Sequence, residues 1–209
     1  MRRYIYFVFL LCCAVNLLLT SCVRQKYVVM DMVHHNPGEA MTESKFLDPS
    51  FLKKNEYGAK VFFLFEAAQF GIDWKSFDPS LFPDTTEAGR WVAEKAEIIH
   101  KKYDAAKKED LQVYCMLDML VLPSLLVEKH RTELTNEQGK LDISKPYTQL
   151  CIRELMKEMF ETFPQLDGLV IRTGETYLHD APYYVGNHPV QNGMYDHITL
   201  INLLREEVC

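Results

Sequence analysis

Four short apolar segments recur along the chain, and polar or amphipathic segments separate them. They cover residues 27–33, 60–65, 111–117 and 169–171. Three are rich in β-branched or aromatic residues, and their apolar residues are nearly continuous. That pattern is typical of strands whose two faces are both buried, as in a parallel sheet covered by helices.

Helical spacing of apolar residues follows each predicted strand. Asp48 and Pro49 predict a helix start, as N-cap and first helical residue, and Gly58 predicts its end. Longer helices are predicted over residues 86–108, 144–164 and 192–208, and residues 118–143 between two elements are predicted to be a long loop. The apolar positions of these helices are, in order, Trp91, Ala96, Ile98, Ile99 and Tyr103; Leu150, Ile152, Leu155, Met159 and Phe163; and Ile198, Ile201, Leu204 and Val208.

Repeated strand–helix units predict an α/β fold, either a doubly wound sheet or a (β/α)8 barrel of the TIM type. No GxGxxG or GxxxxGK[ST] pattern follows a predicted strand, so we expect no nucleotide cofactor. Every strand is followed instead by ionisable residues, at the end where such barrels place their active sites. The barrel is therefore the favoured prediction.

The chain is short for a complete barrel of this type. Such barrels typically need ~250 residues, whereas only four strand–helix units are recognisable within the 209 residues. We expect about half of a barrel, as in a truncated reading frame or a fragment.

Residues 1–21 have the pattern of a bacterial lipoprotein signal peptide. Arg2 and Arg3 precede the apolar run 4–19, and Leu19-Thr20-Ser21 leads directly to Cys22. This order resembles a lipobox, and the resemblance implies that Cys22 is acylated and becomes the first mature residue. A transmembrane anchor is the alternative, but the run is shorter than the roughly 20 apolar residues of a membrane span. We expect residues 22–209 to form the partial barrel, anchored by lipid in the bacterial cell envelope.

Charge and cysteine usage narrow the possible partners. Removal of the leader takes away two arginines and no acid, so the 23 basic residues fall to 21 against 29 acidic ones and the net charge becomes −8. An acidic chain without a basic cluster does not predict nucleic-acid binding. Cys22, Cys115, Cys151 and Cys209 show no metal-ligand spacing.

Candidate chemistry is concentrated where the predicted strands end. The stretch 167–180, DGLVIRTGETYLHD, places Arg172 and Glu175 directly after an apolar strand. A glutamate there can protonate a leaving sugar oxygen, and glycoside cleavage needs a second carboxyl group across the bond. Arg172 can hold a carboxylate bidentately, and tyrosines such as Tyr177 can stack on sugar rings.

Asp167-Gly168, the apolar strand, Gly174-Glu175 and the following loop with Pro, Tyr and Gly resemble the α-glucuronidases of glycoside hydrolase family 67. In that family a strand ends at a Ser-Glu-Gly motif whose glutamate is the general acid, so the resemblance implies this role for Glu175. Here Gly174 precedes the glutamate and Thr176 follows it, and a related barrel family of carbohydrate-active lipoproteins is the broader expectation. The predicted substrate is a poly- or oligosaccharide. The predicted sugar contacts are His34, His35, Glu66, Asp118, Arg172, Tyr177 and His179.

Other functions remain open for the same residues. Glu175 can be an ion-pair partner of Arg172 at the rim, and Glu66 and Asp118 can likewise form rim ion pairs. The histidines can ligate a metal, but they lack an HExxH-type spacing, so no metal is expected. A non-catalytic carbohydrate-binding lipoprotein is the main alternative, because the second catalytic carboxylate is expected to be missing. A metal-dependent hydrolase is the third.

Overall fold

A computed structural model describes residues 28–31, 44–63, 66–173, 176–178 and 180–208. Its centre is a parallel sheet of four strands in the order β1-β2-β3-β5. The strands are β1 (Met30–Asp31), β2 (Ala59–Phe63), β3 (Gln112–Asp118) and β5 (Gly168–Arg172). All four of the predicted strand positions are confirmed.

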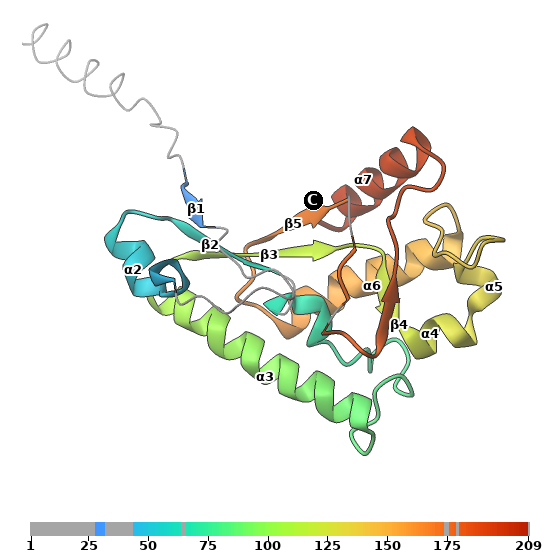
Figure 1. Cartoon of the computed structure of the whole chain (residues 1–209), viewed down its shortest axis with the longest axis horizontal. Helices are drawn as coiled ribbons and strands as arrows, with labels where there is room; N and C mark the ends of the chain where they lie inside the picture. Colours follow the sequence, from blue (N-terminus) through green and yellow to red (C-terminus); the bar gives the residue numbers. More distant parts are fainter. Residues whose placement is uncertain (1–27, 32–43, 64–65, 174–175, 179, 209) are drawn as a thin grey trace, which may run out of the picture.

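Helices connect these strands as the sequence predicts (Figure 1). They are α2 (Pro49–Lys54), α3 (Glu87–Lys108), α6 (Pro146–Thr162) and α7 (Met194–Val208), with short 3-10 turns η1 (Lys45–Leu47) and η3 (Ala68–Phe70). Asp48 caps α2 by accepting a hydrogen bond from the Ser50 amide, and Thr86 caps α3 through the Gly89 amide. These caps satisfy amides that have no partner inside the helix.

The long helices cover one face of the sheet. Alternate residues of β3 (Val113, Cys115 and Leu117) are fully buried on that face. Tyr103 of α3 packs on Phe62 of β2, with ring centroids 4.8 Å apart. The opposite face carries the intervening residues of β3, and Asp118 lies on it at the carboxyl end of the strand.

Sequential strand order and one-sided helices distinguish the two predicted architectures. A doubly wound sheet reverses its strand order and carries helices on both faces, whereas each strand of the four-stranded sheet here lies beside the strand that precedes it within that sheet. The α/β class is confirmed, and the sheet is consistent with part of a (β/α)8 barrel. Within the described ranges the four strands form an open sheet.

The prediction of a long loop over residues 118–143 is wrong. That stretch contains β4 (Val121–Pro123), α4 (Ser124–Lys129) and α5 (Arg131–Leu134), and β4 pairs antiparallel with β6 (Tyr184–Gly186). A Cβ on Gly186 would lie 2.6 Å from the Leu120 carbonyl oxygen, so glycine permits this close approach of two backbones. Strands of three residues are too short for a periodic signal.

The apolar face predicted for the last helix differs from the face that is buried. α7 buries Leu200 and Leu203, which are 1% and 3% exposed, while Ile198 and Ile201 are 47% and 54% exposed. On α6, Leu150 was also expected to face inward and is 42% exposed. Helical spacing identifies apolar stripes but does not say which stripe meets the rest of the chain.

The predicted leader, residues 1–21, and Cys22 lie outside the described residues. Among the helices that the structure does describe, none is long and apolar enough to cross a bilayer.

Candidate functional site

Asp118 and Arg172 form an ion pair at the carboxyl ends of two neighbouring strands. The two residues are directly paired across β3 and β5, so their side chains leave the same face of the sheet. Arg172 Nε donates to Asp118 Oδ1 at 2.6 Å, and Arg172 Nη2 donates to Oδ2 at 2.7 Å. This is the bidentate geometry in which an arginine–carboxylate pair is strongest.

Two aromatic rings contact the Arg172 guanidinium. Its Cζ lies 4.6 Å from the centroid of Tyr177 and 5.3 Å from that of Phe63. Both distances are within the range of a cation–π contact. Phe63 is not among the residues that the sequence pattern selects, although its position on the same face of β2 as Asp118 on β3 is the signal that could identify it.

Asp118 also holds the chain beyond β5. The Tyr177 amide donates to Asp118 Oδ2 at 3.0 Å. One carboxylate therefore binds the side chain of residue 172 and the backbone of residue 177. The segment between these two anchored residues includes Glu175 in the sequence.

Both side chains of this ion pair are largely buried. The Asp118 side chain is 5% exposed and that of Arg172 is 22% exposed. Three hydrogen bonds compensate the Asp118 carboxylate for the hydration that it loses on burial, as a buried charge requires. The bidentate edge of Arg172, predicted to be available for a substrate carboxylate, is occupied by Asp118.

Glu66 does not join this cluster. Its carboxylate forms an ion pair with Lys102 of α3, and its backbone carbonyl accepts a hydrogen bond from the Tyr103 hydroxyl at 2.8 Å. The side chain is therefore directed to the helix-covered face. The structure thus shows an ion pair of Glu66, and its role as a sugar contact stays a prediction.

Four predicted site residues, His34, His35, Glu175 and His179, lie outside the described residues. Their placement as sugar contacts or general acid stays a prediction. Among the residues that the structure places, no group of three or more His, Cys, Asp or Glu side chains is arranged to hold a metal ion.

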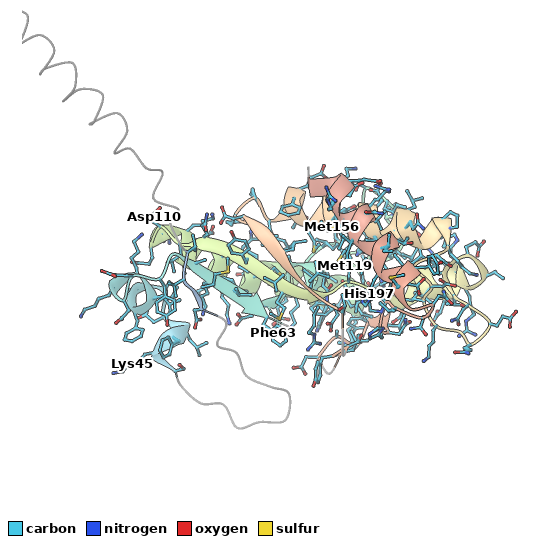
Figure 2. The ribbon with its side chains drawn as sticks, turned by 90° about the horizontal axis from the view of Figure 1, so that it is seen from above. Lys45, Phe63, Asp110, Met119, Met156 and His197 are labelled. Atoms are coloured by element: carbon cyan, nitrogen blue, oxygen red, sulfur yellow. The ribbon has the colours of Figure 1, made fainter. Side chains whose placement is uncertain are left out.

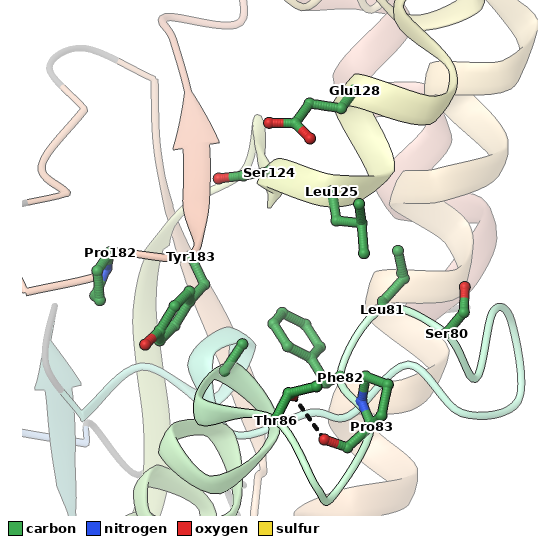
Figure 3. Close-up of a pocket in the computed structure, with 11 residues that line it drawn as sticks. Ser80, Leu81, Phe82, Pro83, Thr86, Ser124, Leu125, Glu128, Pro182 and Tyr183 are labelled. Atoms are coloured by element: carbon green, nitrogen blue, oxygen red, sulfur yellow. Dashed lines mark hydrogen bonds between the residues drawn. The ribbon is translucent and has the colours of Figure 1, made fainter.

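A separate cavity of 310 Å³ lies between the start of α3 and the start of α4 (Figure 3). Phe82 and Leu81 form its apolar wall, and Tyr183 closes another side. Ser124 and Glu128 supply polar groups at its edge. No sequence motif marked this cavity, because its lining comes from four segments that the fold brings together.

No family model matches the chain, and no curated protein sequence does. Among solved structures, the chain is similar to a noncanonic maltogenic α-amylase, AmyB, from Thermotoga neapolitana. The identity is 15%, the TM-score is 0.41, and the match covers 72% of this chain and 40% of the amylase chain. The chain thus spans less than half the length of that protein.

Proposed function

We propose that this chain is a lipid-anchored, carbohydrate-active protein that binds a poly- or oligosaccharide at the carboxyl ends of β3 and β5. The observation that carries the proposal is the double attachment of Asp118 to Arg172 and Tyr177. This attachment fixes Arg172 and Tyr177, which flank Glu175 in the sequence. Positioning of a functional side chain by rigid neighbours is what binding and catalytic sites require.

In this proposal Tyr177 supplies a ring for sugar stacking and Glu175 is the general acid. Arg172 and Asp118 are positioning residues, because they bind each other and Asp118 also binds the Tyr177 amide. Glycoside cleavage would also require a second carboxyl group. Sugar binding is therefore the first activity to test, and cleavage the second.

Sugar binding is tested with the full chain in detergent micelles on a glycan array, followed by calorimetry on the best oligosaccharide. Tyr177→Ala is expected to weaken binding about tenfold, equivalent to ~1.4 kcal/mol. The matched control is Tyr195→Ala, because Tyr195 is 76% exposed on α7, an element that does not contribute to the site. Absence of glycan binding by the wild type, or equal weakening by both variants, would contradict the proposal.

Glu175→Gln separates catalysis from binding. Where the wild type cleaves the glycan that it binds, the variant should keep its affinity and lose ~10²–10⁴-fold in turnover. The loss should be smallest for aryl glycosides whose leaving group needs no proton. Binding without cleavage in the wild type would favour the non-catalytic carbohydrate-binding alternative.

A further inference from the structure

The cavity at the starts of α3 and α4 lies beyond the carboxyl end of the sheet. Asp110 and Met119 flank β3, and Figures 1 and 2 show that the strand points towards the half of the molecule that holds α4. α3 follows the carboxyl end of β2 along the chain, and α4 follows that of β3. The cavity is therefore at the same end of the sheet as the Asp118–Arg172 pair.

The two chain segments that meet at Asp118 meet again at the wall of the cavity. Asp118 accepts a hydrogen bond from the Tyr177 amide at 3.0 Å. Six residues further along each segment, the Ser124 amide donates to the Tyr183 carbonyl at 2.8 Å. Six residues span at most about 20 Å, so the cavity is close enough to the first site for one oligosaccharide to reach both.

Aromatic and aliphatic side chains form most of the cavity wall. Phe82 is 3% exposed, and Leu125 of α4 points towards it (Figure 3). The Phe82 ring packs on Tyr184 with centroids 5.7 Å apart, and the Tyr183 ring packs on Trp91 with centroids 5.8 Å apart. These contacts hold both rings in place without a ligand, so binding requires little further ordering of the wall.

Two polar side chains at the edge of the cavity are available to a ligand. They are the Ser124 hydroxyl and the Glu128 carboxylate, and neither forms a hydrogen bond or ion pair with the residues that the structure describes. Lys129, which follows Glu128, binds Asp78 at 2.8 Å and does not neutralise it. The cavity thus combines an apolar wall with one hydroxyl and one negative charge.

This combination restricts the chemistry of the ligand. A purely apolar ligand would cover Ser124 and Glu128 without replacing their hydrogen bonds to water, which costs free energy, and an anion would be repelled by Glu128. A neutral sugar ring meets both conditions, because its C–H face packs on apolar side chains and its hydroxyls donate to a carboxylate. An apolar amine would meet them too, but the segments shared with the proposed saccharide site favour a sugar. The volume of 310 Å³ is near the lower end of the range for small-molecule sites, about 300–1,000 Å³, and suits a single ring.

We infer that the cavity between α3 and α4 binds one neutral sugar or amino-sugar residue. For the class of its ligand the inference rests on the proposed function, under which this residue belongs to the same poly- or oligosaccharide that contacts Tyr177. Ser124 and Glu128 accept hydrogen bonds from the sugar hydroxyls, and Phe82 and Tyr183 contact the ring. Glu128 excludes uronic acids from this position.

Pyranoses of different charge test this preference. They are methyl glucoside, which is neutral, glucosamine, which is a cation, and glucuronate, which is an anion, each with its galacto counterpart. Binding is titrated by saturation-transfer NMR on the full chain in detergent micelles. Tyr177→Ala is the background, because it removes the ring that the proposed function assigns to the other site. In at least one configuration, the neutral and cationic pyranoses should bind at least about tenfold more tightly than the uronate, because Glu128 repels a second negative charge.

Two substitutions connect this binding to the cavity. Glu128→Gln should abolish the discrimination against uronates, because it removes the charge and keeps the size of the side chain. Leu125→Trp should weaken the binding of each pyranose at least about tenfold, because the indole fills the volume that the ligand needs. The matched control is Leu150→Trp, because Leu125 and Leu150 are 39% and 42% exposed and Leu150 does not line the cavity.

Three results would overturn the inference. They are no pyranose binding in the Tyr177→Ala background, uronates that bind as tightly as the neutral pyranoses, and equal effects of Leu125→Trp and Leu150→Trp. Weaker binding of long array glycans but not of short ones by Leu125→Trp alone would show that one saccharide occupies both sites. Array binding by the wild type and by Tyr177→Ala reports on the proposed function, so its failure and the failure of the cavity site are read separately.

Discussion

At the scale of single residues, Asp118 and Arg172 are unequal partners in their ion pair. Asp118 is almost fully buried, whereas the Arg172 side chain is 22% exposed and has two aromatic rings beside it. Loss of either partner leaves the other without its bidentate contact. The cost of an unpaired charge is greater for the member that water reaches less.

Arg172→Met should therefore destabilise the protein more than Asp118→Asn. We expect Arg172→Met to lower the free energy of unfolding by about 3 kcal/mol, because it leaves the buried carboxylate without its cation and with the Tyr177 amide as its remaining donor among the hydrogen bonds described. Asp118→Asn should cost about 1–2 kcal/mol, because asparagine retains an acceptor and the guanidinium can be hydrated. Urea unfolding followed by circular dichroism measures both. The reverse order would show that Arg172 is the less hydrated partner.

At the scale of elements, the start of α3 is fixed by a close approach at Gly89. The Thr86 hydroxyl accepts from the Gly89 amide at 3.0 Å and donates to the Pro83 carbonyl at 2.7 Å. A Cβ on Gly89 would lie 2.1 Å from that same carbonyl oxygen. The turn before the helix and the cap of the helix therefore depend on one glycine.

Gly89→Ala should destabilise the protein, although alanine is favoured over glycine in a helix by ~1 kcal/mol. The clash with backbone exceeds that gain, and we expect a net loss of about 2 kcal/mol in the free energy of unfolding. Gly139→Ala is the comparison, because a Cβ there meets no atom within 4 Å and only the positive φ of 73° opposes it. That substitution should cost about 1 kcal/mol. A stabilised Gly89→Ala variant would contradict the geometry.

The elements also show which features the sequence could predict. Continuous apolar runs and capping residues located the four parallel strands and the helices between them, because these signals are local. The pairing of β4 with β6 depends on residues more than 60 positions apart and on a glycine contact, so no local pattern marked it. Asp118 and Arg172 were each selected as strand-end residues, but their mutual ion pair depends on strand register. The buried stripe of α7 likewise depends on where α6 lies.

At the scale of the whole molecule, the cysteines that the structure describes are unreactive because they are buried. Cys115 and Cys151 are both buried and reduced. Burial raises the pKa of the Cys115 thiol to about 11 and that of Cys151 to about 12. Thiol reagents attack the thiolate, so both should stay unlabelled near neutral pH in the folded protein. Site-directed labelling at introduced surface cysteines is therefore feasible once Cys209 is replaced by serine.

Such labels can test how the proposed lipid anchor orients the molecule. Cys22 precedes Val28 by six residues, a tether of at most about 20 Å when fully extended. Figure 1 shows β1, α2 and the end of α3 on one side of the molecule, with α4 and α5 on the other. An anchor at Cys22 should thus bring the amino-terminal ends of the strands towards the bilayer and leave the Asp118–Arg172 rim accessible to large polysaccharides.

A fluorophore on Lys108→Cys, at the exposed end of α3, should therefore transfer more energy to a labelled lipid than one on Glu128→Cys of α4. Both variants carry Cys209→Ser and are reconstituted in vesicles after expression with the leader, so that Cys22 can be acylated. Cys22→Ser should abolish membrane retention and transfer from both positions, because the tether no longer ends in lipid. Equal energy transfer from the two positions, or greater transfer from residue 128, would show that the end of the sheet with Asp118 and Arg172 does not face away from the membrane. Retention of the Cys22→Ser variant in the membrane would contradict the proposed lipid anchor, because another part of the chain would then hold the protein there.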